Sequence, residues 1–154
     1  MPKYIAISCM LLLLQTVVVC AQVRPTEDDV FALEARALMG DRRAVATLFS
    51  LYPASDGAVT EDIDIVLGRV AQVHPLVFLE ELKAHRPALQ CSNVSNLGEE
   101  FVDQFDKQLL ELTARRDALA SVEDASVAEQ RGSCLAQLDD AMRVVAQSPD
   151  SGDR

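Results

Sequence analysis

Residues 26–40 read TEDDVFALEARALMG, and residues 60–74 open with the same three letters in TEDIDIVLGRVAQVH. When the chain is compared with itself at an offset of 34 residues, the segments 26–53 and 60–87 share further identities. The identical pairs are Thr26/Thr60, Glu27/Glu61, Asp28/Asp62, Leu33/Leu67, Ala37/Ala71, Leu48/Leu82 and Pro53/Pro87. A period of this size is typical of stacked supersecondary units. The other interpretations of the echo are a paired acidic site and a coincidence.

Each of the two segments has the pattern of a helix pair. Thr26 and Thr60 are good N-cap residues, and each is followed by Glu-Asp, which the helix dipole favours in the first turn. In the first segment, Gly40 predicts a helix end and Asp41 predicts the cap of a second helix. In the second segment, Pro75 suits the first turn of the next helix. We therefore interpret the triplets as helix starts and not as a paired acidic site.

The period stops after the second unit, and the rest of the chain predicts a longer helical hairpin over 96–147. Asn96 with Glu99 resembles a capping box, and Ser126 with Glu129 is a second one. The apolar side chains that follow them recur at helical spacing. They are Phe101, Phe105, Leu109, Leu112 and Leu119 in the first helix, and Val127, Cys134, Leu135, Leu138, Ala141, Met142 and Val145 in the second.

The sequence thus predicts an all-α protein of about six helices in a single domain, residues 22–147. Two helix-pair units with a period of 34, 26–53 and 60–87, are capped by the hairpin, and residues 148–154 form a flexible tail. The units resemble the helix pairs of HEAT and tetratricopeptide repeats, but the tetratricopeptide Trp, Gly and Tyr pattern is not present. The resemblance implies a class of architecture and carries over no functional residues.

Residues 1–21 have the features of an export signal: the basic Lys3, an apolar run from Tyr4, and the small residue Ala21. We predict cleavage after Ala21 and a periplasmic or extracellular location. One alternative is an uncleaved membrane anchor, because the apolar run approaches the length that spans a bilayer. The other is lipidation at Cys20.

Cysteine usage predicts one disulfide. Of the four cysteines, Cys9 and Cys20 lie in the signal, which leaves Cys91 and Cys134 in an oxidising compartment. A bridge that closes this loop would stabilise the fold by roughly 3–4 kcal/mol. The alternative, a redox or metal-ligand pair, lacks a CxxC spacing or a nearby histidine.

Charge and motif content exclude several functions. The formal net charge of −10 disfavours nucleic acid and anionic lipid as partners. No hydrolase elbow, phosphate-binding loop or metal-ligand spacing occurs, so we predict no cofactor, no metal and no catalytic residue. The histidines, His74 and His85, suit helix boundaries, and Asp103 and Asp106 would face each other on one helix. Asn93 begins an N-glycosylation pattern.

Two basic doublets stand out against the acidic background, Arg42-Arg43 and Arg115-Arg116. One interpretation is pairing with acids a helical turn away, for example Glu111 with Arg115. The other is contact with an acidic partner, because Arg is enriched at interfaces. We carry all four arginines as candidate partner contacts.

These observations favour an exported helical module that binds another protein, as an inhibitor, an immunity-type factor or an adaptor. Stacked helix pairs present extended surfaces that suit such partners. A small helical enzyme or a small-ligand-binding protein, with a pocket between the repeat units and the hairpin, is the first alternative. An envelope-anchored structural protein is the second.

Overall fold

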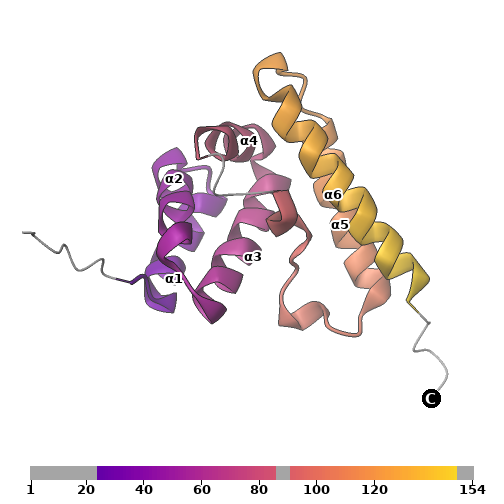
Figure 1. The fold of residues 1–154 in the computed structure, drawn as a ribbon, viewed down its shortest axis with the longest axis horizontal. Helices are drawn as coiled ribbons and strands as arrows, with labels where there is room; N and C mark the ends of the chain where they lie inside the picture. The colour runs from indigo at the N-terminus through magenta and orange to yellow at the C-terminus, as the bar shows by residue number, and fades with distance from the viewer. Residues whose placement is uncertain (1–23, 86–90, 149–154) are drawn as a thin grey trace, which may run out of the picture.

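The computed structural model describes residues 24–85 and 91–148, and these residues form the predicted all-α fold (Figure 1). In this part of the chain there are six α-helices and no β-strand. The helices are α1 (Glu27–Leu38), α2 (Arg42–Leu51), α3 (Gly57–Val73), α4 (Pro75–Ala84), α5 (Phe105–Ala120) and α6 (Ala128–Gln147). Short 3₁₀ helices are η1 (Tyr52–Ala54), η2 (Cys91–Ser95), η3 (Glu99–Phe101) and η4 (Ala125–Val127). The predicted signal and the tail from residue 149 lie outside the described residues.

The helices form two parts, which Figure 1 shows beside each other. In the α1–α4 stack, α1 contacts α2 and α3, and α4 contacts the same two helices. α5 and α6 form a long hairpin beside this stack. α3 is central because it also contacts α5 and η2, so it joins the two parts.

Local signals begin and end the first helices as predicted. Thr26 and Asp29 form a capping box, in which the Asp29 carboxylate accepts from the Thr26 amide at 2.8 Å. Hydrogen bonds from the Thr26 amide and hydroxyl lower the pKa of Asp29. Gly40 has φ +82°, the left-handed conformation that glycine adopts after a helix end. Asp41 caps α2, since its Oδ1 accepts from the amide of Arg43 at 2.9 Å.

The second triplet does not begin a helix, and this prediction is wrong. α3 begins at Gly57, with Asp56 as its N-cap residue, so Thr60 lies inside the first turns of the helix. The Thr60 hydroxyl bonds to the Ser55 hydroxyl at 2.8 Å. The turn at 55–57 provides an earlier start, because Gly57 readily adopts its φ of +46°. The period of 34 is therefore not confirmed, although α1 packs on α3 and α2 on α4.

The core contains buried side chains from all six helices, and α3 contributes the largest number of them. Phe49 of α2 and Phe78 of α4 are both buried, with ring centroids 5.8 Å apart. Burial of such a side chain contributes about 2–3 kcal/mol. Other fully buried side chains are Val45, Leu48, Ile63, Leu67, Val70, Leu79, Leu112, Leu119 and Leu138. Pro75 begins α4 as predicted, with His74 as the residue before it.

The hairpin begins later than predicted. Asn96 and Glu99 do not start a long helix: the Asn96 side chain accepts from the Gly98 amide at 3.2 Å in a turn, and α5 begins only at Phe105. Gly98 and Asp103 have φ of +95° and +60°, which a helix cannot contain. Residues 91–104 therefore form a loop with two 3₁₀ turns instead of a helix.

The start of the last helix is also shifted. Ser126 lies in η4, where its amide donates to Asp124 at 2.7 Å, and α6 begins at Ala128. The predicted capping box at Ser126 and Glu129 is therefore not the start of α6. The predicted inner face of the helix is confirmed, because Cys134 and Leu138 are fully buried.

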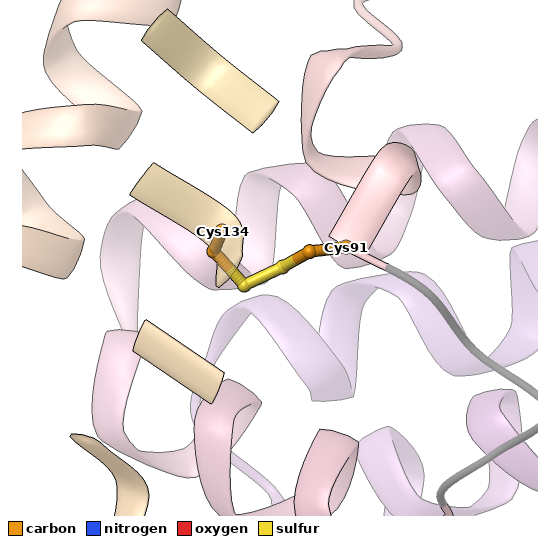
Figure 2. Close-up of a disulfide and its surroundings, with 2 residues drawn as sticks. All are labelled: Cys91 and Cys134. Atoms are coloured by element: carbon orange, nitrogen blue, oxygen red, sulfur yellow. A yellow bond between two sulfur atoms is a disulfide. The ribbon is translucent and has the colours of Figure 1, made fainter. Parts of the chain in front are cut away.

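The predicted disulfide joins Cys91 of η2 to Cys134 of α6 (Figure 2). The two Cα atoms are 4.9 Å apart, within the range that a disulfide bridges. Both cysteines are buried, and η2 lies between α3 and α6. The bridge thus fixes the beginning of the 91–104 loop to the hairpin.

Candidate functional site

An open groove of about 430 Å³ runs between α1 and α3, and we call it the acidic groove. Five of its lining side chains are acidic, one is basic and four are apolar. They are Glu27, Asp28, Glu34, Asp62, Glu100, Arg69, Val30, Phe31, Ile65 and Val66. Phe31 is 78% exposed, so the groove has a large unburied aromatic side chain in its wall. The groove therefore combines negative charge with free apolar surface.

The apolar surface continues along α1 on a face that no described residue covers. Phe31, Ala32, Ala35 and the C-cap residue Met39 are exposed. Phe31, Ala35 and Met39 recur every four residues and Ala32 lies three residues before Ala35, which places the four on one side of the helix. We call these four residues the α1 outer face. Met39 is 75% exposed. Two of the four are alanines, so the middle of this face is flat and a second helix could approach it closely.

The C-terminal ends of α1 and α3 lie close together, and an exposed apolar side chain is present at each. Val73 is 52% exposed. Gly40, the residue after Met39, lies against the ring of His74, the residue after Val73. The ends of α1 and α3 are held together there, because Nε2 of His74 is 3.1 Å from the carbonyl oxygen of Leu38.

The charges of the acidic groove are unbalanced. Arg69 is its one cation and donates to Glu34 at 2.8 Å and to Glu100 at 3.0 Å. Glu27, Asp28 and Asp62 form no ion pair with any described residue. Negative charge in the first turn of α1 is stabilised by the helix dipole. Asp62 lies in the second turn of α3, beyond that effect, so the groove carries unpaired negative charge of its own.

A second groove, also of about 430 Å³, lies between the 95–102 loop and the hairpin, and we call it the loop groove. Its apolar side chains are Leu97, Phe101, Val102, Leu112, Ala141, Val144 and Val145. Its polar side chains are Glu61, Ser95, Asn96, Glu99 and Gln108. It lies between the α1–α4 stack and the hairpin, where the small-ligand alternative expects a pocket, but it is open to solvent.

The first basic doublet lies on the surface of α2, away from both grooves. Arg42 donates to Glu80 at 2.6 Å and to Glu81 at 2.7 Å, and these contacts raise its pKa. Arg42 thereby ties α2 to α4. Arg43 is exposed and makes no ion pair with a described residue. The structure thus assigns Arg42 to an internal ion pair and leaves Arg43 at the surface.

The second doublet is divided between the core and the surface, and this corrects the prediction for Arg115. Arg115 is 1% exposed, and its Nη1 donates to the carbonyl oxygens of Val94 at 2.8 Å and Asn96 at 2.7 Å. Burial lowers its pKa to about 10, although the nearby Glu111 opposes this. Arg116 is half exposed and donates to Asp139 of α6 at 2.6 Å. Arg115 therefore holds the 91–104 loop and is not available to a partner.

Room for the Arg115 side chain comes from Gly68 of α3. A Cβ atom at Gly68 would lie 2.2 Å from Nη1 of Arg115 and 2.9 Å from its Cζ. The guanidinium thus occupies space that any other residue would fill. The predicted pairing of Arg115 with Glu111 is present, with Nε 4.0 Å from Oε1.

The two histidines lie at the predicted helix boundaries. His85 follows α4, stacks on Phe49 and has Nδ1 2.9 Å from the carbonyl oxygen of Glu81. Its Nε2 is 3.3 Å from the hydroxyl of Ser50, which resembles a nucleophile and base pair. The Ser50 hydroxyl instead donates to the carbonyl of Ala46 at 2.8 Å, and neither groove includes this pair.

The carboxylates that the sequence analysis singled out do not line either of the two grooves. Asp103 precedes α5 and Asp106 lies within it, so they do not face each other on one helix as predicted. Neither they nor Glu111 line a groove. Asp64 on α3 is the carboxylate whose pKa is raised: burial raises it to about 6, while a hydrogen bond from Tyr52 opposes the change. The sequence feature that could have identified Asp64 as a buried carboxylate is its position between apolar residues of α3.

The chain has no match in three comparisons with known proteins. A scan of the chain against models of protein families, a search of curated proteins and a search of solved structures each found no match. Within residues 24–85 and 91–148, no helix is long and apolar enough to cross a membrane. In the same part of the chain, no three His, Cys, Asp or Glu side chains are arranged to hold a metal ion.

Proposed function

We propose that this protein is an exported protein-binding module, and that the α1 outer face together with the acidic groove is its docking surface. The observation that carries the proposal is the exposure of Phe31 and Met39 on one face of α1. An apolar side chain of this size gains about 2–3 kcal/mol when it is buried, so a free apolar face favours a partner. The proposal covers an inhibitor, an immunity-type factor and an adaptor, because each acts through such a contact.

Export belongs to the proposal on two grounds. Residues 1–21 have the pattern of an export signal, and a buried disulfide is typical of proteins in oxidising compartments. An envelope-anchored protein would retain that N-terminal segment. The intact mass of the protein recovered from its native compartment separates the two, because cleavage after Ala21 removes a defined mass.

The test is an affinity capture with matched variants of the full chain. Phe31→Ala removes the largest exposed side chain of the docking surface. Leu110→Ala is the control, because Leu110 is 72% exposed but lies on α5, outside both grooves. We expect one protein to bind the unmodified chain and the control in equal amounts and to be lost from Phe31→Ala. A partner that binds all three chains equally would contradict this docking surface.

A second candidate function is the binding of a small apolar ligand in the loop groove. Its lining of seven apolar side chains, with two valines of α6 at the rim, favours this alternative. An uncharged solvatochromic dye such as Nile red is a suitable probe, because the groove contains carboxylates but no cation. Val145→Trp fills the groove and should abolish dye binding, which is followed by fluorescence. Equal dye binding by the variant would remove this candidate.

A further inference from the structure

We propose that the partner docks through a cationic amphipathic helix, which lies along the α1 outer face with its basic end over the acidic groove. This inference rests on the proposed function and adds the chemistry of the partner. It follows from the polarity of the surface, its length, its shape and its unpaired charge.

The docking surface has an acidic end and an apolar end. α1 and α3 run in the same direction, because Glu34 contacts Arg69 and, one turn further on, Leu38 contacts His74. The carboxylates of Glu27, Asp28 and Asp62 therefore gather at one end. Met39 and Val73 lie at the other end and are both exposed. A complementary segment must carry cations at one end and apolar side chains along the rest.

The dimensions of the surface fit a helix. From Asp28 of the acidic groove to Met39 of the α1 outer face the surface extends over eleven residues, or about 16 Å at 1.5 Å per residue. Three turns of a partner helix cover this length. Ala32 and Ala35 lie in its middle, and small side chains let helix axes approach to about 8–10 Å. Phe31 and Met39 on either side of the alanines would pack into the grooves between the partner's side chains.

The partner must supply positive charge, because the one cation that lines the acidic groove is already paired. Arg69 is already engaged with Glu34 and Glu100. A neutral or acidic helix over the remaining carboxylates would remove water from them without replacing its hydrogen bonds, which is costly. Arginines on the partner would replace those bonds in the planar geometry that carboxylates favour.

A second copy of this chain fits the surface less well. In a symmetric dimer the same face meets itself, so the acidic ends would contact either each other or the apolar ends. Neither arrangement pairs the carboxylates with cations. An anionic membrane surface is disfavoured for the same reason, since it would face the carboxylates of the acidic groove.

The proposal can be tested with three synthetic peptides and the full chain. Each peptide is a helix of about 18 residues with leucines at i, i+4, i+7 and i+11, and one of these leucines is replaced by tryptophan. Two turns at one end carry arginine in the first peptide, glutamine in the second and glutamate in the third. Because the chain contains no tryptophan, the peptide tryptophan reports binding without background.

Matched charge variants locate the binding. Asp28→Asn with Asp62→Asn removes two unpaired carboxylates of the acidic groove. Asp106→Asn with Glu123→Gln removes two exposed carboxylates elsewhere and changes the net charge equally. We expect the arginine peptide to bind the groove variant about five- to tenfold more weakly than the control variant. Its affinity should fall as salt is raised.

The outcomes separate the inference from the proposed function. Equal binding of the arginine and glutamine peptides, both weakened by Phe31→Ala, would overturn the cationic partner but keep the docking surface. Peptide binding that Phe31→Ala leaves unchanged would overturn both. Absence of binding by all three peptides would overturn the inference, while the affinity capture still tests the function. A dimer in sedimentation that Phe31→Ala dissociates would assign the surface to a second copy and overturn the cationic helix.

Discussion

The α1–α4 stack and the C-terminal part of the chain are held together by different means. In the stack, helices that follow one another pack directly, and their ends coincide with signals such as Thr26, Gly40 and Asp41. The 91–104 loop instead depends on the Cys91–Cys134 disulfide and on Arg115 of α5. Local signals therefore suffice for consecutive helices, whereas an irregular segment between helices requires contacts with residues far along the chain.

The strongest test of this difference removes the disulfide. The double variant Cys91→Ala with Cys134→Ala should lose about 3–4 kcal/mol of unfolding free energy, because the bridge closes a loop of 43 residues in the unfolded chain. Urea denaturation followed by circular dichroism measures the loss. Amide exchange locates it, and protection should fall in residues 91–104 before it falls in α1 to α4. Uniform loss of protection would show that the two parts are not held differently.

The second test compares the two arginines of one doublet. Arg115→Ala should cost about 3 kcal/mol, because two loop carbonyls lose their donor and a cavity forms beside Gly68. Arg116→Ala should cost less than about 1 kcal/mol, since its ion pair with Asp139 is exposed to solvent. Urea denaturation of both variants measures the difference. Similar losses would mean that Arg115 does not tie the loop to α5.

The burial of Arg115 was not predicted from the sequence, although part of the signal for it is present there. Leu112, Arg115 and Leu119 are three and four residues apart and share one face of α5, and all three are buried. The spacing was available in the sequence and places Arg115 among core residues. Its partners were not available, because they are carbonyls of an irregular loop and a space left by Gly68 on another helix.

The other predictions also differ according to whether a local sequence pattern determines the feature. The all-α class, the disulfide and the starts of α1, α2 and α4 follow from local patterns and cysteine content, and they are confirmed. The helix start at Thr60 failed because an upstream turn competes with it. The proposed docking surface could not be predicted, since periodicity finds the apolar residues of α1 but does not show that Phe31 and Met39 remain uncovered.

The third test concerns Asp64, the carboxylate of the stack whose pKa is raised and not lowered. Burial raises the pKa of Asp64 to about 6 from the ordinary 3.8, so the folded chain holds this proton more tightly than the unfolded chain. The resulting stability is full below pH 3.8 and is lost as pH rises through about 6. Asp64→Asn should therefore match the parent near pH 4 and exceed it at pH 7 by roughly 1 kcal/mol, allowing for solvent screening. Urea denaturation at both pH values checks this, and a difference that does not change with pH would contradict it.

The smallest expected difference in stability is between variants of the two Thr-Glu-Asp triplets, which begin at Thr26 and Thr60. Thr26→Ala removes a capping box and should cost about 1 kcal/mol. Thr60→Ala lies inside α3, where the lost bond to Ser55 is offset by the better helix propensity of alanine, and it should change stability by less than about 0.5 kcal/mol. Urea denaturation under identical conditions distinguishes the two variants. Equal losses of unfolding free energy would mean that Thr60 stabilises α3 as much as Thr26 stabilises α1, which would support the predicted repeat of 34 residues. The two variants therefore measure how far local capping signals determine the structure of the stack.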